Sequence, residues 1–306
     1  MIEQVVQIPL AVGEDLVIQK NRTGSGDKRL CVVTGTHGDE LEGQYVAWRL
    51  ARLLREQPEH LHGVVDIYPA LNPLGVSTMT RSIPLCELDM NRTFPGSEQG
   101  SMSEFMAARL IQDMAGADAC IDIHASNIYL REIPQVRINE NTAERLVPLA
   151  KKLNMDMLWI HAAATVLEST LAHSLNALDT PTLVVEMGVG MRLTRSYGDQ
   201  LITGILSLMS YLGMWDAPVM PIAPPIISSD GHVSFVNASR PGIFIPSVEH
   251  NSYVVQGQQL GAVVDPLTGD ICETLECPAS GLLFTLREYP VVYEGSLLAR
   301  ILGGGI

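Results

Sequence analysis

Short apolar runs alternate with helical patterns through the first two-thirds of the chain. Leucine and valine recur on one helical face over residues 41–57, which predicts an amphipathic helix. A second helix is predicted over residues 104–116, with Ser101 or Ser103 as its cap and Gly116 at its end. Strands that alternate with such helices are typical of the α/β class, with a mixed, largely parallel sheet flanked by helices. The apolar, β-branched runs predict buried strands at residues 29–35, 63–72, 117–126 and 180–190.

The pattern changes near residue 215, where a proline-rich stretch predicts a linker or an extended crossover. Closely spaced short β-runs with turn residues follow, so we predict two domains, residues 1–215 and a small β domain over residues 216–306. The second resembles the barrel-sandwich hybrid of biotin and lipoyl carriers. Carriers need an exposed lysine, and no lysine follows Lys152, so the carrier role is excluded. A lid, a filter for substrate size and an oligomer contact remain open.

Acidic residues outnumber basic ones, 34 to 20, for a formal net charge of −14. Nucleic acid and anionic membranes need clustered lysine and arginine, so neither is an expected partner. The first residues lack the basic region of a signal peptide, and the apolar runs are too short to span a membrane. Two of the cysteines, Cys31 and Cys120, lie in apolar runs and are expected to be buried thiols. We therefore predict a reduced, cytoplasmic protein.

Polar side chains that bind metals follow two of the predicted strands. His37 and Glu40 lie between the first strand and the first helix, and His124 ends a later strand. Ligand sites in open α/β sheets collect at the carboxyl ends of the strands, so we expect these residues to meet. Two histidines and one carboxylate leave one position for water, as in catalytic zinc sites. Asp122 is a candidate to orient one ligand. Taken singly, a histidine after an apolar strand is more often a core or surface residue than a ligand. The pair His37 and Glu40 alone is also compatible with a surface histidine and a carboxylate at the start of a helix.

Glu186 ends an apolar strand, where burying a carboxylate without a partner costs several kcal/mol. Beside a metal site, such a carboxylate suits the role of a general base. The alternative is a solvated glutamate at the end of the strand. Arg81 and Arg92 flank a proline-containing loop, and a planar guanidinium suits a carboxylate or a developing oxyanion. The alternative for these is a pair of surface arginines bonded to Glu87 and Asp89.

Four motifs together make the pattern specific: HGDE, then D-MNR-FPG, then D-IH, then VEMG. In this order they resemble the succinylglutamate desuccinylase/aspartoacylase family of zinc carboxypeptidase-like enzymes, over residues 28–215. The resemblance implies one Zn²⁺ per chain, held by His37, Glu40 and His124. It also implies that Glu186 is the base that activates the water.

The same resemblance assigns Arg81, in the loop before the second motif, and the polar residues of that motif. It implies that Arg81 acts at the polarised carbonyl or the oxyanion, and that Asn91 and Arg92 bind the carboxylate of the substrate. Further arginines are candidates for substrate contact without a motif to support them: Arg131, Arg137 and Arg192. The remaining histidines considered lack partners at ligand spacing and are expected to be structural or on the surface: His161, His173, His232 and His250.

These residues lead to a hypothesis of a zinc-dependent deacylase, an amidohydrolase that cleaves a linear, non-peptide amide. Its substrate would be a small N-acyl amino acid or a related amide that carries a carboxylate. The alternatives are a metallocarboxypeptidase that acts on short peptides and a non-catalytic ligand-binding protein on the same scaffold. An ester hydrolase is also accessible to this chemistry. Self-association into a homo-oligomer is compatible with the sequence.

Overall fold

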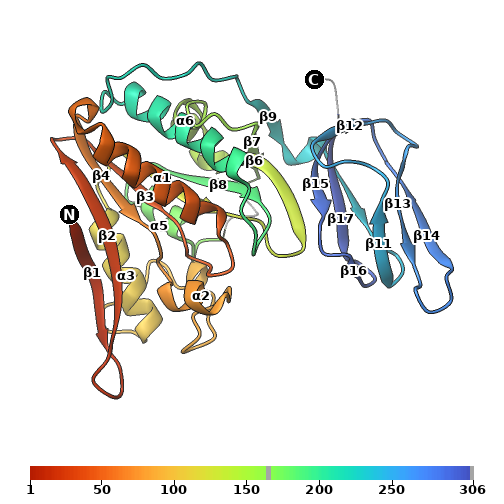
Figure 1. Ribbon diagram of the computed structural model, residues 1–306, viewed down its shortest axis with the longest axis horizontal. Coiled ribbons are helices and arrows are strands. Elements are labelled where there is room, and N and C mark those ends of the chain that lie inside the picture. The colour runs from red at the N-terminus through yellow and green to blue at the C-terminus, as the bar shows by residue number, and fades with distance from the viewer. Residues whose placement is uncertain (163–166, 304–306) are drawn as a thin grey trace.

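The computed structural model describes residues 1–162 and 167–303 (Figure 1). None of the described helices has the length and apolar character needed to cross a membrane. The first two-thirds of the chain contain β1 (Ile2–Pro9), β2 (Asp15–Ser25), β3 (Arg29–Val33), α1 (Glu42–Glu56), η1 (Pro58–His60), β4 (Gly63–Tyr68), α2 (Pro73–Thr78), η2 (Met90–Arg92), α3 (Met102–Met114), β5 (Ala119–His124), β6 (Leu130–Asn139), η3 (Glu140–Thr142), α4 (Ala143–Ala150), β7 (Met157–His161), α5 (Leu171–Ala177), β8 (Thr182–Gly188) and α6 (Arg195–Tyr211). The remainder contains β9 (Ile226–Ser229), η5 (Asp230–His232), β10 (Val233–Asn237), β11 (Gly242–Pro246), β12 (Ser252–Val254), β13 (Gln259–Val264), β14 (Ile271–Glu276), β15 (Gly281–Arg287), β16 (Val291–Val292) and β17 (Leu297–Gly303).

Over the described residues, one 13-stranded sheet has the order β1-β2-β4-β3-β5-β8-β6-β15-β17-β10, with β7 and β12 paired beside β6 and β15, and β9 beside β7. Its centre is parallel, because β3 pairs in parallel with β4 and β5, and β5 with β8. The flanking pairs β2–β4 and β6–β8 are antiparallel. The predicted mixed α/β sheet is confirmed. Because β3, β5 and β8 are parallel neighbours, the predicted site residues at or after their carboxyl ends lie at one edge of the sheet.

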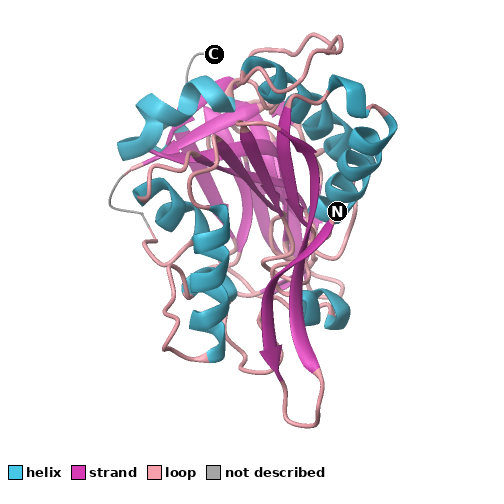
Figure 2. Cartoon of the chain, turned by 90° about the vertical axis from the view of Figure 1, so that its left-hand side faces the viewer, coloured by secondary structure: helices cyan, strands magenta, loops and turns pink. Residues whose placement is uncertain are grey.

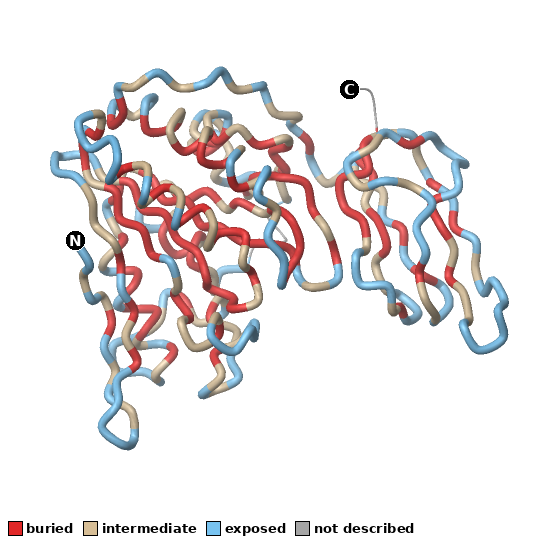
Figure 3. Tube along the Cα trace, viewed as in Figure 1, coloured by how far each residue is buried: buried red, intermediate tan, exposed pale blue. Residues whose placement is uncertain are grey.

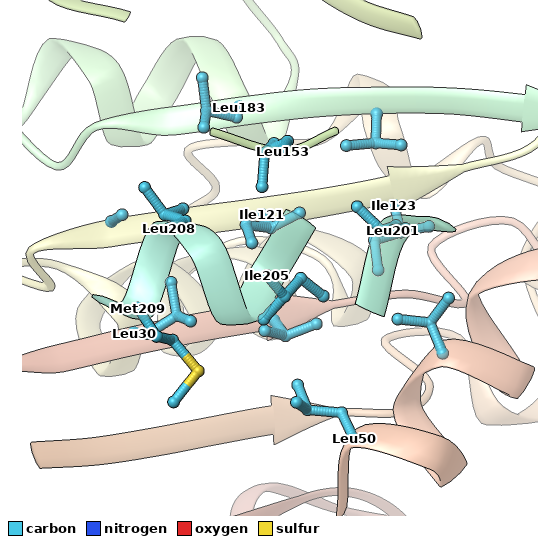
Figure 4. Packing of buried hydrophobic residues seen from close by; sticks show 14 of the residues in the cluster. Leu30, Leu50, Ile121, Ile123, Leu153, Leu183, Leu201, Ile205, Leu208 and Met209 are labelled. Carbon is cyan, nitrogen blue, oxygen red and sulfur yellow. The ribbon is translucent and has the colours of Figure 1, made fainter. Parts of the chain in front are cut away.

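Helices cover both faces of this sheet, and each face has its own core (Figure 2). On one face α1 and α6 pack together, and Ile121 and Ile123 of β5 belong to the same buried cluster as Ile205 of α6 (Figure 4). On the other face Cys120 of β5 packs with α3 and α5. Since side chains alternate along a strand, Asp122 and His124 point to this second side. A fully buried leucine or isoleucine contributes about 1.5–3 kcal/mol, so these two cores fix the strand ends firmly.

Of the two predicted caps, Ser101 is the one that caps α3. Its Oγ accepts from the backbone N of Glu104, and the Glu104 carboxylate accepts from the backbone N of Ser101. This capping box fixes the start of the helix. The helix ends at Met114, and Gly116 follows with φ +77°, which confirms the predicted stop. Cys31 and Cys120 are buried free thiols, as expected, and burial raises the pKa of Cys31 to about 12.

The proline-rich stretch has no helix or strand over residues 216–225 and runs along the surface from α6 to β9 (Figure 3). Beyond it the chain is rich in antiparallel strands, including a second, 4-stranded sheet in the order β14-β13-β11-β16. However, β9 pairs with β7, and β15 pairs with β6, so the main sheet continues into this region. The division at residue 215 therefore stays a prediction.

Candidate active site

The predicted metal ligands His37 and Glu40 lie in the loop between β3 and α1, which packs closely on α2. A Cβ atom on Gly38 would lie 1.9 Å from the carbonyl carbon of Gly75, so only glycine fits there. This contact fixes His37 and Glu40 on either side of Gly38 and Asp39. His124 is the last residue of β5, and β3 and β5 are parallel neighbours. The two strands therefore deliver their side chains to the same edge of the sheet.

His37, Glu40 and His124 form one buried group whose potential ligand atoms all lie within 4.8 Å of one another. Nδ1 of His37 is 2.7 Å from Oε1 of Glu40, and Nδ1 of His124 is 2.9 Å from Oε2. The three predicted ligands are thus brought together by the fold. Two imidazoles and a carboxylate are a donor set that suits zinc.

Each histidine also has a carboxylate on its other ring nitrogen. Nε2 of His37 is 3.0 Å from Oδ1 of Asp89, which also accepts from the backbone N of Asn91. Nε2 of His124 is 3.2 Å from Oδ2 of Asp122, an ion-pair distance with poor hydrogen-bond alignment. Carboxylates in this place orient histidine ligands in metal sites. The residues present therefore fit a bound zinc ion.

The charges of this group stabilise one another despite burial. Burial alone would raise the pKa of Glu40, but His124 and His37 lower it to about 2. Burial would lower the pKa of His124, but Asp122 and Glu40 raise it well above the ordinary value. Burial would likewise lower the pKa of His37, but Asp89 and Glu40 raise it. A metal ion must displace a proton from any ligand nitrogen that carries one.

Glu186 is the register partner of His124 on β8, so its carboxylate lies beside the metal-binding group. Its side chain is 16% exposed, and Oε1 is 3.4 Å from Nη1 of Arg137. Burial raises the pKa of Glu186, and the Arg137 guanidinium opposes that rise only in part. A carboxyl group with a raised pKa is suited to exchange protons near neutral pH.

Arg81 and the residues of the second motif approach the same group from the segment before α3. Nη1 of Arg81 is 3.2 Å from Oε1 of Glu40, and Nη2 is 3.1 Å from Oδ2 of Asp89. Asn91 and Arg92 lie in η2, where Nη1 of Arg92 donates to the carbonyl oxygen of Asn91 at 2.7 Å. The pairing of Arg81 with Asp89 agrees with the alternative that Arg81 bonds to a nearby acidic residue. Arg81 also contacts Glu40, which that alternative did not include.

One cavity of about 1010 Å³ connects these side chains. Its size suits a small organic ligand with room to spare. All of the predicted site residues line it: His37, Glu40, Arg81, Asn91, Arg92, His124 and Glu186.

The three arginines without a motif have different positions. Arg137 lines the cavity and contacts Glu186. Arg131 pairs with Glu288 at 3.1 Å outside the cavity lining, and Arg192 donates to the carbonyl oxygen of Met191. Only Arg137 of the three is therefore placed to act on a ligand.

Two of the histidines expected to be structural or on the surface line the cavity. These are His161, whose Nδ1 is 3.0 Å from Oδ1 of Asp230, and His173. The sequence did not reveal the position of His161 because its partner Asp230 is 69 residues away along the chain. His232 is exposed, and Nε2 of His250 lies 3.2 Å from a backbone carbonyl oxygen, so these two agree with the expectation.

Sequence reasoning also missed Glu132 and Arg300, which line the same cavity. Neither belongs to a recognisable motif, and Arg300 comes from β17 near the far end of the chain. A weak signal existed for Glu132, since it is the one acidic residue in the stretch 130–138 around Pro134. Nothing local marks Arg300.

A model of the succinylglutamate desuccinylase/aspartoacylase catalytic domain matches residues 26–212. The N-alpha-acetyl-L-2,4-diaminobutyric acid deacetylase of Halomonas elongata is 33% identical over 116 residues. That match covers 37% of this chain and 32% of the deacetylase, so it spans about a third of the relative's length.

Solved structures show the same fold over nearly the whole chain. The product-bound ectoine utilization protein EutE from Ruegeria pomeroyi gives a TM-score of 0.85 at 18% identity, over 99% of this chain and 95% of that one. A succinylglutamate desuccinylase/aspartoacylase from Rhodobacter sphaeroides gives 0.82 at 22% identity, over 100% and 96%. The family model covers more than half of the sequence, and its motifs meet in one cavity. The chain belongs to the succinylglutamate desuccinylase/aspartoacylase family.

Proposed function

We propose that this protein is a zinc-dependent deacylase that hydrolyses the amide bond of a small N-acyl amino acid or a related carboxylate-bearing amide. One observation carries the proposal: a buried His37–Glu40–His124 group lies beside Glu186 in a cavity lined by Arg81 and other arginines. Membership of a family named for a desuccinylase and an aspartoacylase supports it.

The metal would be held by His37, Glu40 and His124, with Asp89 and Asp122 behind the two imidazoles. When bound, a zinc ion lowers the pKa of water and polarises a carbonyl group, which is the chemistry that amide hydrolysis needs. The three proposed ligands are 3–4% exposed, and electrostatic contacts between buried groups are stronger than contacts in water.

The side chains around the metal-binding group would divide the remaining tasks. Glu186 would take the proton of the attacking water and pass it to the leaving nitrogen, for which its raised pKa is suited. Arg81 would stabilise the negative charge that develops on the carbonyl oxygen. Arg92, positioned with Asn91 at the cavity wall, would bind the carboxylate of the substrate through its planar guanidinium.

The class of substrate is supported by the cavity and by the relatives. Arg92 lines the cavity and makes no ion pair within the described residues, so its guanidinium is available to the carboxylate of an anionic substrate. The curated relative from Halomonas elongata is a deacetylase of an N-acetylated amino acid. A small acylated amino acid therefore accounts for the site better than a nucleic acid or a lipid.

The test is the zinc content of the purified protein together with hydrolysis of N-acetylated and N-succinylated amino acids, N-alpha-acetyl-L-2,4-diaminobutyrate among them. We expect about one zinc ion per chain. In His124→Ala the zinc and the hydrolysis should be lost together. His62→Ala is the matched control, because His62 lies on the surface and its Nε2 bonds to Asp216 at 2.6 Å.

Short peptides in the same panel separate a carboxypeptidase from a deacylase. Cleavage of dipeptides without cleavage of N-acyl amino acids would make the peptidase the better assignment. A wild-type protein that stays inert with zinc restored would overturn both and leave a ligand-binding protein.

A further inference from the structure

Glu132 on β6 is a buried carboxylate, 1% exposed, whose two oxygens are fully used. Oε1 accepts from Arg300 at 2.6 Å and from Arg137 at 3.3 Å. Oε2 accepts from Gln135 at 2.8 Å and from Thr285 at 2.7 Å. A buried carboxylate with this many donors is held in one orientation. It therefore fixes both arginines with respect to the sheet.

An irregularity in β6 makes this arrangement possible. Glu132 and Arg137 are five residues apart, and in a regular strand an odd separation places side chains on opposite faces. The register with β8 shifts here, since Glu132 pairs with Gly188 and Gln135 with Glu186. The step from one pair to the next is thus one residue longer on β6 than on β8, as in a β-bulge. The shift brings Glu132 and Arg137 to the same side, where Glu186 lies.

The C-terminal strands supply the other half of the cluster. Thr285 of β15 is the register partner of Glu132, and Arg300 of β17 is the register partner of Thr285. The two guanidinium groups share one aromatic ring, because Arg137 lies 5.6 Å and Arg300 5.5 Å from the centroid of Trp159. Both arginines are therefore restrained by a carboxylate and by a ring face.

Arg137 uses its other nitrogen on Glu186, at 3.4 Å. The contacts form a continuous chain from Arg300 through Glu132 and Arg137 to the carboxylate beside the metal-binding group. The cluster contains two carboxylates and two guanidinium groups, so its charges balance without any bound anion. The structure thus gives Arg137 a partner within the protein, and a substrate carboxylate is not needed to neutralise it.

We propose that Arg137 is a positioning residue that holds Glu186 in place, and that Glu132 and Arg300 fix Arg137 for this task. The expected effects on kcat and KM rest on the proposed function, in which Glu186 is the general base. It also gives the C-terminal strands a defined role. Arg300 makes β17 part of the apparatus that orients Glu186, and the site is incomplete without it.

Arg137→Ala tests the proposal in the zinc-loaded, full-length protein. We expect kcat to fall about 10- to 100-fold, because a displaced base loses its geometry, while KM changes little and zinc content stays the same. Methylguanidinium added to the variant should restore part of kcat. Arg131→Ala is the matched control on the same strand, since Arg131 pairs with Glu288 outside the cavity lining and should leave kcat unchanged.

Other results would overturn the proposal. A raised KM with unchanged kcat would make Arg137 a contact for the substrate. An unchanged kcat would remove it from the reaction, and a loss that methylguanidinium does not relieve would point to general disruption of the fold. Arg300→Lys keeps a charge beside Glu132 and is the milder second variant, for which we expect a smaller fall in kcat in the same direction.

A measurement on the metal-free protein keeps this inference separate from the proposed function. Thermal unfolding of Arg137→Ala, Glu186→Gln and the double variant measures whether the two side chains are coupled. We expect the change in Tm of the double variant to differ from the sum of the single changes. Additive changes would contradict the contact itself. If the wild type hydrolyses no substrate but the changes are non-additive, the proposed function fails and the contact stands.

Discussion

Asp89 shows how much of the site depends on a single side chain without direct metal contact. One oxygen faces His37 and accepts from the backbone N of Asn91, and the other accepts from Arg81. The Asp89 carboxylate thus orients His37, the backbone at Asn91 and the guanidinium of Arg81. Asp89 and His37 are 52 residues apart along the chain, so no local pattern in the sequence reveals this contact.

We predict that Asp89→Asn lowers zinc affinity by about 10- to 100-fold, because an amide cannot support the basicity of the His37 ring as a carboxylate does. Competition with a chromogenic chelator measures the affinity. Asp118→Asn is the control, since Asp118 pairs with Lys28 away from the cavity. Equal affinities for the wild type and Asp89→Asn would show that the contact has no bearing on the metal.

At the scale of elements, the site is made by the carboxyl ends of neighbouring parallel strands and by the turns that follow them. β3, β5 and β8 are consecutive in the sheet, and their cores on both faces are closely packed. The turn after β3 is further fixed by α2, whose backbone touches Gly38. The position of the metal ligands therefore depends on the packing of an element that contributes no ligand.

Gly38→Ala tests this dependence. The added Cβ would meet the backbone of Gly75, so we expect a loss of stability of about 1–3 kcal/mol and a weaker zinc site. Urea denaturation and zinc titration measure the two effects. Gly231→Ala is the control, because its Cβ would meet nothing within 4 Å. A variant with native stability and affinity would show that the turn can shift without moving His37.

At the scale of the whole molecule, the C-terminal strands are joined to the α/β sheet by pairing and by a shared core. β15 pairs with β6. One hydrophobic cluster contains Met157 and Trp159 of β7 together with Leu282 and Phe284 of β15. The rings of Trp159 and Phe284 lie 5.3 Å apart, edge to face. An interface of this kind favours unfolding as one unit rather than as two.

We expect a single cooperative transition for the full chain in urea. A variant with Trp159 as its only tryptophan (Trp48→Phe, Trp215→Phe) reports the contact between β7 and β15 by fluorescence. Its transition should coincide with that of the far-ultraviolet circular dichroism signal. Separate transitions would support the two domains predicted from the sequence as independent folding units.

The strands predicted from apolar runs all exist. Other strands, such as β2 and β6, contain residues that argue locally against a buried strand. β2 carries the buried Lys20, which pairs with Asp113 at 2.8 Å, and a lysine in a strand does not predict burial. β6 contains Pro134, and a proline within a run argues against a strand. In both cases tertiary partners compensate for a residue that is locally unfavourable, and no local pattern reveals those partners.

The sequence by itself determined that His37, Glu40 and His124 would meet at the ends of neighbouring strands. His37, Glu40 and His124 follow apolar strands, and parallel neighbours bring their ends together whatever the details of packing. The tertiary structure alone decided the neighbours of Glu186. Glu132 and Arg300 are 168 residues apart, and they meet because of strand pairing and a one-residue shift in register. Such contacts depend on how strands from distant parts of the sequence are aligned in the sheet. No local stretch of the sequence specifies that alignment.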